Sequence, residues 1–243
     1  TGFRTWGTYY GGGLSDYGFA CTVDASGNPY LTGDTYSGSA IASGGHQNTF
    51  GGGTLRDAFL VKFNSAGARQ WATYYGGESD EVLHEIEVDK FNNVIIGGLT
   101  NSSTNIATGG ALQTVAGGAS DGFVAKFSSA GAMIWSTFLG YSNNDYVVAI
   151  ASDKDGDLYI AGVSQSVVTL PPGAYKDTNS GSSDVLLIKL KANGNYAYST
   201  FYGGSAVEYL SEICVDLNKN CYIAGYSAST WGIATPGAYQ TSS

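Results

Sequence analysis

Apolar residues in this chain occur in short runs, and no segment shows a sustained helical period. Between residues 84 and 139 the runs are "HEIEVD", "NVIIGG", "GFVAKF" and "MIWSTFL". Runs of this length, rich in β-branched and aromatic residues and bounded by Gly or Asn, are typical of β-strands. The pattern therefore predicts four strands within this stretch.

The same pattern returns along the whole chain. "WGTYYGG" begins at Trp6, "WATYYGG" at Trp71, "WSTFLGY" at Trp135 and "YSTFYGG" at Tyr198, at spacings of 65, 64 and 63 residues. An aspartate lies 18 positions after each start, and a glycine lies nine positions after that aspartate. Such self-similarity indicates a repeat architecture with a period of about 64 residues.

The second half of each unit also repeats. "DAFLVKF" (57–63), "DGFVAKF" (121–127) and "DVLLIKL" (184–190) match in pattern, and length varies only in the loops that precede them. Four antiparallel strands per unit, apolar on both faces, are expected of β-propeller blades, which stack on one another. The predicted fold is therefore all-β, a β-propeller segment of four-stranded antiparallel blades.

The alignment divides this single propeller domain, residues 1–243, into five parts. We expect a lone outer strand in 1–12, blades in 13–77, 78–141 and 142–204, and the first half of a further blade in 205–243. Unpaired strand edges at both ends would invite aggregation. We therefore expect this chain to be part of a longer chain or a larger assembly.

Composition narrows the functional classes. The net charge of −9 argues against a nucleic-acid partner, because phosphate binding requires clustered Lys and Arg. No apolar run is long enough for a membrane-spanning helix. Only His46 and His84 are present, and there is no G-x-S-x-G motif. We therefore assign no catalytic residue and expect no enzyme activity.

"DKDGD" (153–157) resembles the start of a calcium loop. Its aligned counterparts are "DASGN" (24–28), "DKFNN" (89–93) and "DLNKN" (216–220), and only the first Asp is shared. An Asp that opens a hairpin turn accepts backbone N–H bonds two or more residues on, which explains all four copies. A calcium site formed by Asp153, Asp155 and Asp157 is the alternative; apart from it we expect no cofactor.

Two further features are candidates for ligand binding. An acid precedes the first strand of every unit, at Asp16, Glu81, Asp145 and Glu208. These acids either form a ring that binds a cation or a cationic group, or cap their own loops. Trp231, in a variable loop where no other unit has a Trp, is a candidate contact for a ligand or partner. Cys214 and Cys221 lie on the two arms of one expected hairpin, and the sequence does not decide whether they pair.

The segments "TYYGG", "VDASGNPYLTG", "TPGAYQ" and "DAFLVKF" resemble the SBBP β-propeller repeat, common in secreted bacterial proteins, notably of Bacteroidetes. The resemblance covers essentially the whole chain. It departs at Tyr141, which replaces the second Gly of the "GG" pair, and in the turns of the later units. It implies the fold and a secreted or cell-surface location, but it transfers no catalytic residue.

We therefore expect a non-catalytic extracellular binding or scaffold module that presents its variable loops to a protein or glycan partner, without membrane insertion. Low charge and abundant Ser, Thr, Asn and Tyr suit such an adhesive, carbohydrate-contacting surface. The alternatives are a polysaccharide-active hydrolase or lyase with its site at the channel mouth, and a structural spacer within a large surface assembly.

Overall fold

The computed structural model describes residues 2–241, which form strands and loops without a helix. Blade 1 contains β1 (Asp16–Val23), β2 (Pro29–Thr35), β3 (Asp57–Phe63) and β4 (Arg69–Tyr75). Blade 2 contains β5 (Glu81–Val88), β6 (Val94–Thr100), β7 (Asp121–Phe127) and β8 (Met133–Leu139). Blade 3 contains β9 (Asp145–Ser152), β10 (Leu158–Ser164), β11 (Asp184–Leu190) and β12 (Tyr196–Tyr202). A hairpin of β13 (Glu208–Val215) and β14 (Cys221–Ser227) follows.

Every sheet is an antiparallel meander with its strands in chain order, consistent with β-propeller blades. The first strand of each sheet carries a register shift where it pairs with the second. This shift brings the first strand's backbone against the repeated glycine. A Cβ on Gly98 would lie 2.0 Å from the Val82 carbonyl oxygen, and a Cβ on Gly33 would lie 1.8 Å from that of Tyr17. The glycine nine residues after each turn aspartate is thus required by close backbone approach.

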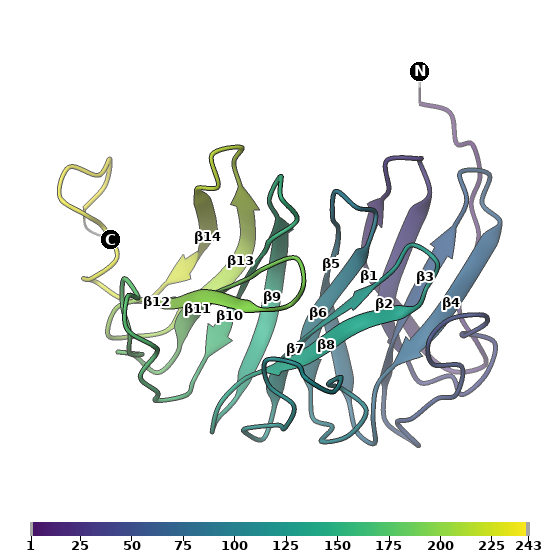
Figure 1. Ribbon diagram of the computed structural model, residues 1–243, viewed down its shortest axis with the longest axis horizontal. Helices are drawn as coiled ribbons and strands as arrows, with labels where there is room; N and C mark the ends of the chain where they lie inside the picture. The colour runs from purple at the N-terminus through teal and green to yellow at the C-terminus, as the bar shows by residue number, and fades with distance from the viewer. Residues whose placement is uncertain (1, 242–243) are drawn as a thin grey trace.

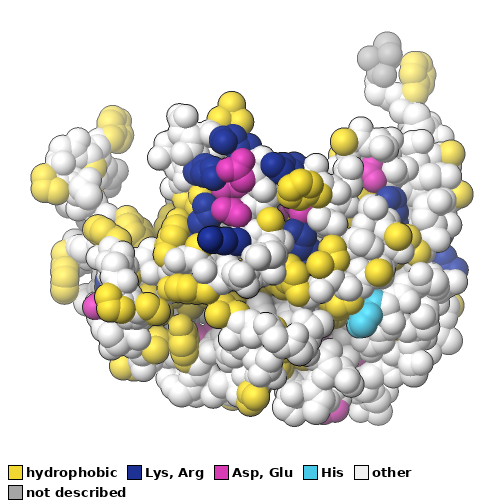
Figure 2. Space-filling view, viewed as in Figure 1, with side chains coloured by type: hydrophobic (Ala, Val, Ile, Leu, Met, Phe, Trp, Pro, Cys, Tyr) yellow, Lys and Arg dark blue, Asp and Glu magenta, His cyan; other side chains and the backbone are white. Residues whose placement is uncertain are grey.

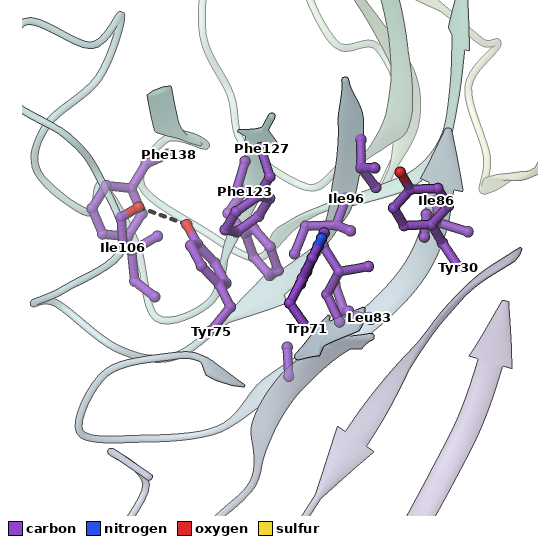
Figure 3. Packing of buried hydrophobic residues seen from close by; sticks show 14 residues of the cluster. Tyr30, Trp71, Tyr75, Leu83, Ile86, Ile96, Ile106, Phe123, Phe127 and Phe138 are labelled. Carbon is purple, nitrogen blue, oxygen red and sulfur yellow. Dashed lines mark hydrogen bonds between the residues drawn. The ribbon is translucent and has the colours of Figure 1, made fainter. Parts of the chain in front are cut away.

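The sheets stack in a row, with each first strand beside the first strand of the next sheet. Figure 1 shows this row as an open arc, with the two described ends of the chain far apart. The core lies between the sheets. Trp71 and Tyr75 of β4 pack with Phe123 and Phe127 of blade 2 in one buried cluster (Figure 3). Apolar residues on both faces of a strand are explained by this stacking.

The arc is not a closed ring. At its two ends, β1 and the β13–β14 hairpin leave aromatic side chains exposed, among them Tyr17 on β1 and Tyr226 on β14. The described residues contain no helix long and apolar enough to cross a membrane.

Residues 2–15 contain no strand before β1, although we expected a lone outer strand in 1–12; residue 1 lies outside the described residues. No described third strand lies beside this segment to pair with it. The segment still packs like a fourth strand, because Trp6 and Tyr10 contact Phe63 of blade 1. The three sheets and the hairpin fall within the other expected ranges, of which residues 242–243 also lie outside the described part.

The register of the β13–β14 hairpin shows whether Cys214 and Cys221 lie close enough to pair. Cys214 lies opposite Tyr222, and Cys221 lies opposite Val215. Side chains alternate between faces along a strand, so the two cysteines point to opposite faces of the hairpin. Both are free thiols in this structure.

Candidate functional site: the two rims of the blades

The blades have two rims with different chemistry. We call one the turn rim; it is formed by the tight turns 24–28, 64–68, 89–93, 128–132, 153–157, 191–195 and 216–220. We call the other the loop rim; it is formed by the variable loops 36–56, 101–120, 165–183 and 228–241, and by the connections 76–80, 140–144 and 203–207. Alternate strand directions place these two sets at opposite ends of the sheets (Figure 1).

On the turn rim, the first aspartate of each turn holds the turn itself. Asp153 accepts backbone N–H bonds from Asp155 at 2.8 Å and from Asp157 at 3.1 Å. Asp24, Asp89 and Asp216 accept the same pair of bonds in their own turns. The turn role proposed for all four copies therefore matches the hydrogen bonds that they make.

A lysine from the third strand then neutralises this aspartate within each complete blade. Lys62 lies 3.2 Å from Asp24, Lys126 lies 2.8 Å from Asp89, and Lys189 lies 3.3 Å from Asp153. Burial alone would raise the pKa of Asp24, but hydrogen bonds from Asn28 and the Lys62 ammonium lower it to about 2. The sequence signal was the Lys at the sixth position of every third strand, which we had used only as part of the repeat.

"DKDGD" is surrounded by further lysines. Lys189 also lies 3.4 Å from Asp157, and Lys219 lies 2.5 Å from Asp155 and 3.7 Å from Asp153. Figure 2 shows the resulting patch, in which Lys and Arg side chains surround Asp and Glu side chains. The ammonium groups stand where a calcium ion would have to bind Asp153, Asp155 and Asp157. Among residues 2–241, no group of three or more His, Cys, Asp or Glu side chains is arranged to hold a metal ion.

On the loop rim, the acid at the start of each first strand anchors the connection before it. Glu81 accepts the Gly77 N–H at 3.1 Å and the Thr100 hydroxyl at 2.6 Å. Asp145 accepts the Tyr141 N–H at 2.6 Å. Asp16 and Glu208 accept the N–H of Gly12 and Gly204 in the same way.

These acids are capped rather than presented to solvent. Glu81, Asp145 and Glu208 are buried, and Asp16 is partly buried. Burial raises the pKa of Glu81 to about 7, against the effect of its hydrogen bonds. The loop-capping alternative thus describes the contacts of all four candidate acids.

A second set of acids, which the sequence analysis did not single out, lies at the start of each third strand. Asp57 accepts the N–H groups of Gly51 and Gly52 at 2.8 and 2.7 Å. Burial raises the pKa of Asp57 to about 6. Asp121 and Asp184 are also buried and accept N–H bonds from their own loops. The signal that would have found them is the Asp that opens "DAFLVKF", "DGFVAKF" and "DVLLIKL".

Tyrosine hydroxyls donate a hydrogen bond to a backbone carbonyl in three of the four variable loops. Tyr10 donates to the Ile41 carbonyl at 2.6 Å, Tyr75 to that of Ile106 at 2.6 Å (Figure 3), and Tyr202 to that of Ile233 at 2.7 Å. At the aligned position before blade 3 the residue is Leu139, which has no hydroxyl. The loop of blade 3 therefore lacks this pin.

Trp231 and the histidines have separate environments. Trp231 is 66% exposed and lines a hollow of about 350 Å³ together with Ser229 and Ile233. His84 Nδ1 lies 2.7 Å from the Val147 carbonyl oxygen, and the His46 ring packs edge-on against Phe127. The structure does not bring Trp231 together with the four acids in this hollow.

Two comparisons with known proteins agree with this architecture. A family of repeats described as "SBBP: Beta-propeller repeat" matches residues 134–167, which run from β8 to just beyond β10. The "Uncharacterized WD repeat-containing protein L264" of Acanthamoeba polyphaga mimivirus is 24% identical over 200 residues, which is 71% of this chain and 14% of that protein. The chain thus spans a small part of that relative's length. Both comparisons support a β-propeller repeat protein, and neither carries a catalytic assignment.

Proposed function

We propose that this chain is a non-catalytic binding scaffold that presents its loop rim to a protein partner. The observation that carries the proposal is the repeated anchoring of the loops. In every unit a carboxylate accepts N–H bonds at the start of the first strand, and in each complete blade a second carboxylate does so at the start of the third. The frame is thus repeated while the loop sequences vary, an arrangement suited to recognition by surface loops.

The distribution of acids supports a role without catalysis. The four candidate acids of the loop rim accept hydrogen bonds from backbone N–H and hydroxyl groups, and three of them are buried. A polysaccharide hydrolase would need two carboxyl groups that reach the bond to be cleaved. In the alternative of an enzyme, Asp145 would have to act from a buried position, with one carboxylate oxygen bonded to the Tyr141 N–H and the Ser166 hydroxyl.

We extend this proposal to location and partner class from the composition. The surface is poor in charge and rich in Tyr, Ser, Thr and Asn, as expected for a secreted or cell-surface adhesive module. Segments of a protein partner would contact the loops directly. A glycan that stacks on Trp231 is the outcome that would redirect the proposal from protein binding to carbohydrate binding.

The test compares exposed aromatic residues on the two rims. The full chain and its Trp231→Ala and Phe91→Ala variants would be screened on peptide and glycan arrays, because Phe91 is an exposed aromatic residue of the turn rim. We expect peptide ligands whose binding weakens about tenfold with Trp231→Ala and is unchanged with Phe91→Ala. Equal losses for both variants would contradict loop-rim recognition. Turnover of a polysaccharide that is lost in Asp145→Asn would contradict the non-catalytic role.

A further inference from the structure

The loop of blade 3 pairs with its outer strand β12 at Lys176, which bonds Thr200 and Phe201, but lacks a second pairing that the loops of blades 1 and 2 make. In blade 1, Ser43 and Ala72 of β4 exchange both backbone hydrogen bonds at 2.9 Å. In blade 2, the Thr108 N–H donates to the Ser136 carbonyl of β8 at 3.0 Å, and the Ser136 N–H donates to the Thr108 hydroxyl. The aligned loop residues in blade 3 are Pro172, which matches Ser43, and Pro171, which matches Thr108, and neither proline has an N–H to donate.

The matching atoms of β12 are consequently unpaired. Ser199 occupies the place of Ala72 and Ser136 in the strand register. Among the described residues, no loop segment bonds the outward backbone N–H or C=O of Ser199, although the Phe201 N–H two residues on still donates to Lys176. Ser199 is only 3% exposed, so these groups are largely withdrawn from solvent. Backbone groups in that condition are normally paired.

A groove of about 750 Å³ lies beside this edge, between blades 2 and 3. Its lining includes Leu139, Tyr141, Val168, Pro171 and Ser199. Two substitutions in the repeat help to open it. Leu139 replaces the tyrosine whose hydroxyl pins the loop elsewhere, and Tyr141 replaces a glycine. At the aligned Gly77, a Cβ would lie 2.2 Å from the Thr104 carbonyl oxygen, so a side chain there is compatible only with a displaced loop.

A second unpartnered group lies next to the groove. Trp135 lines an adjoining hollow of about 440 Å³ that shares Leu112 and Tyr196 with the groove. The indole N–H of Trp6 and of Trp71 each donates to a turn carbonyl at 3.0 Å. Trp135 is 9% exposed and its Nε1 has no partner within the part of the chain that the structure describes. A buried indole N–H without an acceptor is unusual among buried polar groups and marks this place as different from the other units.

We propose that this groove binds an extended peptide segment that pairs with the β12 edge at Ser199 and places an aliphatic side chain against Leu139 and Val168. The occupant is argued from the chain itself, because the loops of blades 1 and 2 pair with the same edge position in this way. Each of these loops places a buried isoleucine, Ile41 or Ile106, two residues before the paired residue. Strand addition of this kind derives affinity from backbone bonds and specificity from side-chain pockets. The inference rests on the proposed binding role and names the chemical class of its ligand.

The probe is a capped peptide with the sequence SGSAIASGG, which is residues 37–45 of this chain, added to the full ¹⁵N-labelled protein. We expect saturable shifts of the Ser199 amide and the Trp135 indole N–H resonances. The same peptide with Ile replaced by Asp should bind at least about tenfold more weakly, because it would bury a charge against apolar residues. Trp135→Phe serves to assign the indole resonance.

The double variant Leu139→Tyr, Tyr141→Gly restores the residues found in the other units and should close the groove. We expect it to lose peptide binding. Tyr75→Phe, which removes the hydroxyl bonded to the blade 2 loop and lies between blades 1 and 2, should retain peptide binding. Pro172→Ser restores an N–H opposite Ser199 and is a second route to closure if the double variant does not fold. Peptide binding that survives both closing variants would overturn the proposal, as would the absence of any shift at millimolar peptide.

Two outcomes separate this inference from the broader proposal. If a small apolar compound shifts Trp135 while the peptide does not, the groove is a small-molecule site and the peptide inference is wrong. If the array experiment shows no role for Trp231 while the groove binds the peptide, the proposed use of that loop fails and this inference stands.

Discussion

The loops of blades 2 and 3 start from the same frame and differ in how they are held. In blade 2, the Tyr75 hydroxyl holds Ile106, and Thr108 pairs with Ser136 of β8. In blade 3, Leu139 and Pro171 occupy the corresponding positions, and neither bond is formed. The loop of blade 3 borders a groove of about 750 Å³.

This difference shows how a repeat protein acquires a site without altering its core. The strand pairings, the turn aspartates and the loop-rim acids are the same in both blades. The differences at the blade 3 loop lie in a few side chains at the edges of the repeat, among them Leu139 and Tyr141. Surface loops tolerate such changes because few tertiary contacts depend on them.

The largest loss of stability is expected from breaking the lysine–aspartate pair that blades 2 and 3 both contain. Lys126 is 2% exposed, pairs with Asp89 and donates to the Ala192 carbonyl at 3.0 Å. Lys126→Met should destabilise the protein by about 3–5 kcal/mol, because it leaves Asp89 buried without its cation. Chemical denaturation measures the loss. Lys189→Met is the comparison, and it should cost less because Lys219 also lies near Asp153; equal losses would contradict the role of Lys219.

A Cβ added where the connection 76–80 packs against the loop of blade 2 should destabilise the protein less than the loss of the Lys126 ammonium group. At Gly77 a Cβ would lie 2.2 Å from the Thr104 carbonyl oxygen. Gly77→Ala should therefore destabilise by about 2 kcal/mol through overpacking, as measured by denaturant midpoint. Gly109→Ala is the control, because nothing lies within 4 Å of a Cβ there. If Gly77→Ala were as stable as Gly109→Ala, the contact between Gly77 and the loop of blade 2 would not be tightly packed.

Titration of Glu81 should make the free energy of unfolding depend on pH. Burial raises its pKa from 4.5 to about 7, so the folded state binds more protons than the unfolded state between these values. As far as this group contributes, stability should be greatest below pH 4.5 and should fall by about 3 kcal/mol as the pH rises to 7.

Glu81→Gln keeps a hydrogen-bond acceptor and should flatten this part of the stability profile. Thermal unfolding at intervals from pH 5 to pH 8 tests the prediction. An unchanged slope in the variant would assign the pH dependence to other buried acids, such as Asp57.

Removal of the tyrosine pin alone should have a smaller effect. Tyr75→Phe deletes the hydroxyl that donates to Ile106 and should cost about 1 kcal/mol, typical of one hydrogen bond. Faster amide exchange in residues 101–112 should accompany it, with no change in residues 165–176. A rigid loop after this substitution would show that the Thr108 pairing is sufficient to hold it.

The smallest effect is expected at "DKDGD". Lys154, Lys189 and Lys219 already balance the charge of Asp153, Asp155 and Asp157. Addition of millimolar calcium should leave the melting temperature unmoved. A rise that disappears in Asp155→Asn would show that calcium displaces the lysines.

Most of the frame was predictable because the repeat exposes it. The strands, the turn aspartates and the glycine opposite the register shift each recur at fixed spacing, so one unit explains the others. Residues 6–10 keep the sequence of a fourth strand but have no third strand beside them, and strand formation requires that partner.

The groove was not predictable because it arises from absent contacts. The sequence shows Leu139, Tyr141 and Pro171 as departures, but their meaning depends on contacts that Tyr75, Gly77 and Thr108 make only in the fold. The buried Nε1 of Trp135 gives no signal at all, since the same Trp is bonded in the other units.

The exchange rate of the Ser199 amide tests the central claim most directly. The amides of Ala72 and Ser136 donate to loop acceptors, whereas no described residue accepts from Ser199. We expect the Ser199 amide to exchange with solvent deuterium at least about tenfold faster than the other two. Equal protection of all three amides would mean that the loop of blade 3 is held like the others, and would contradict the account.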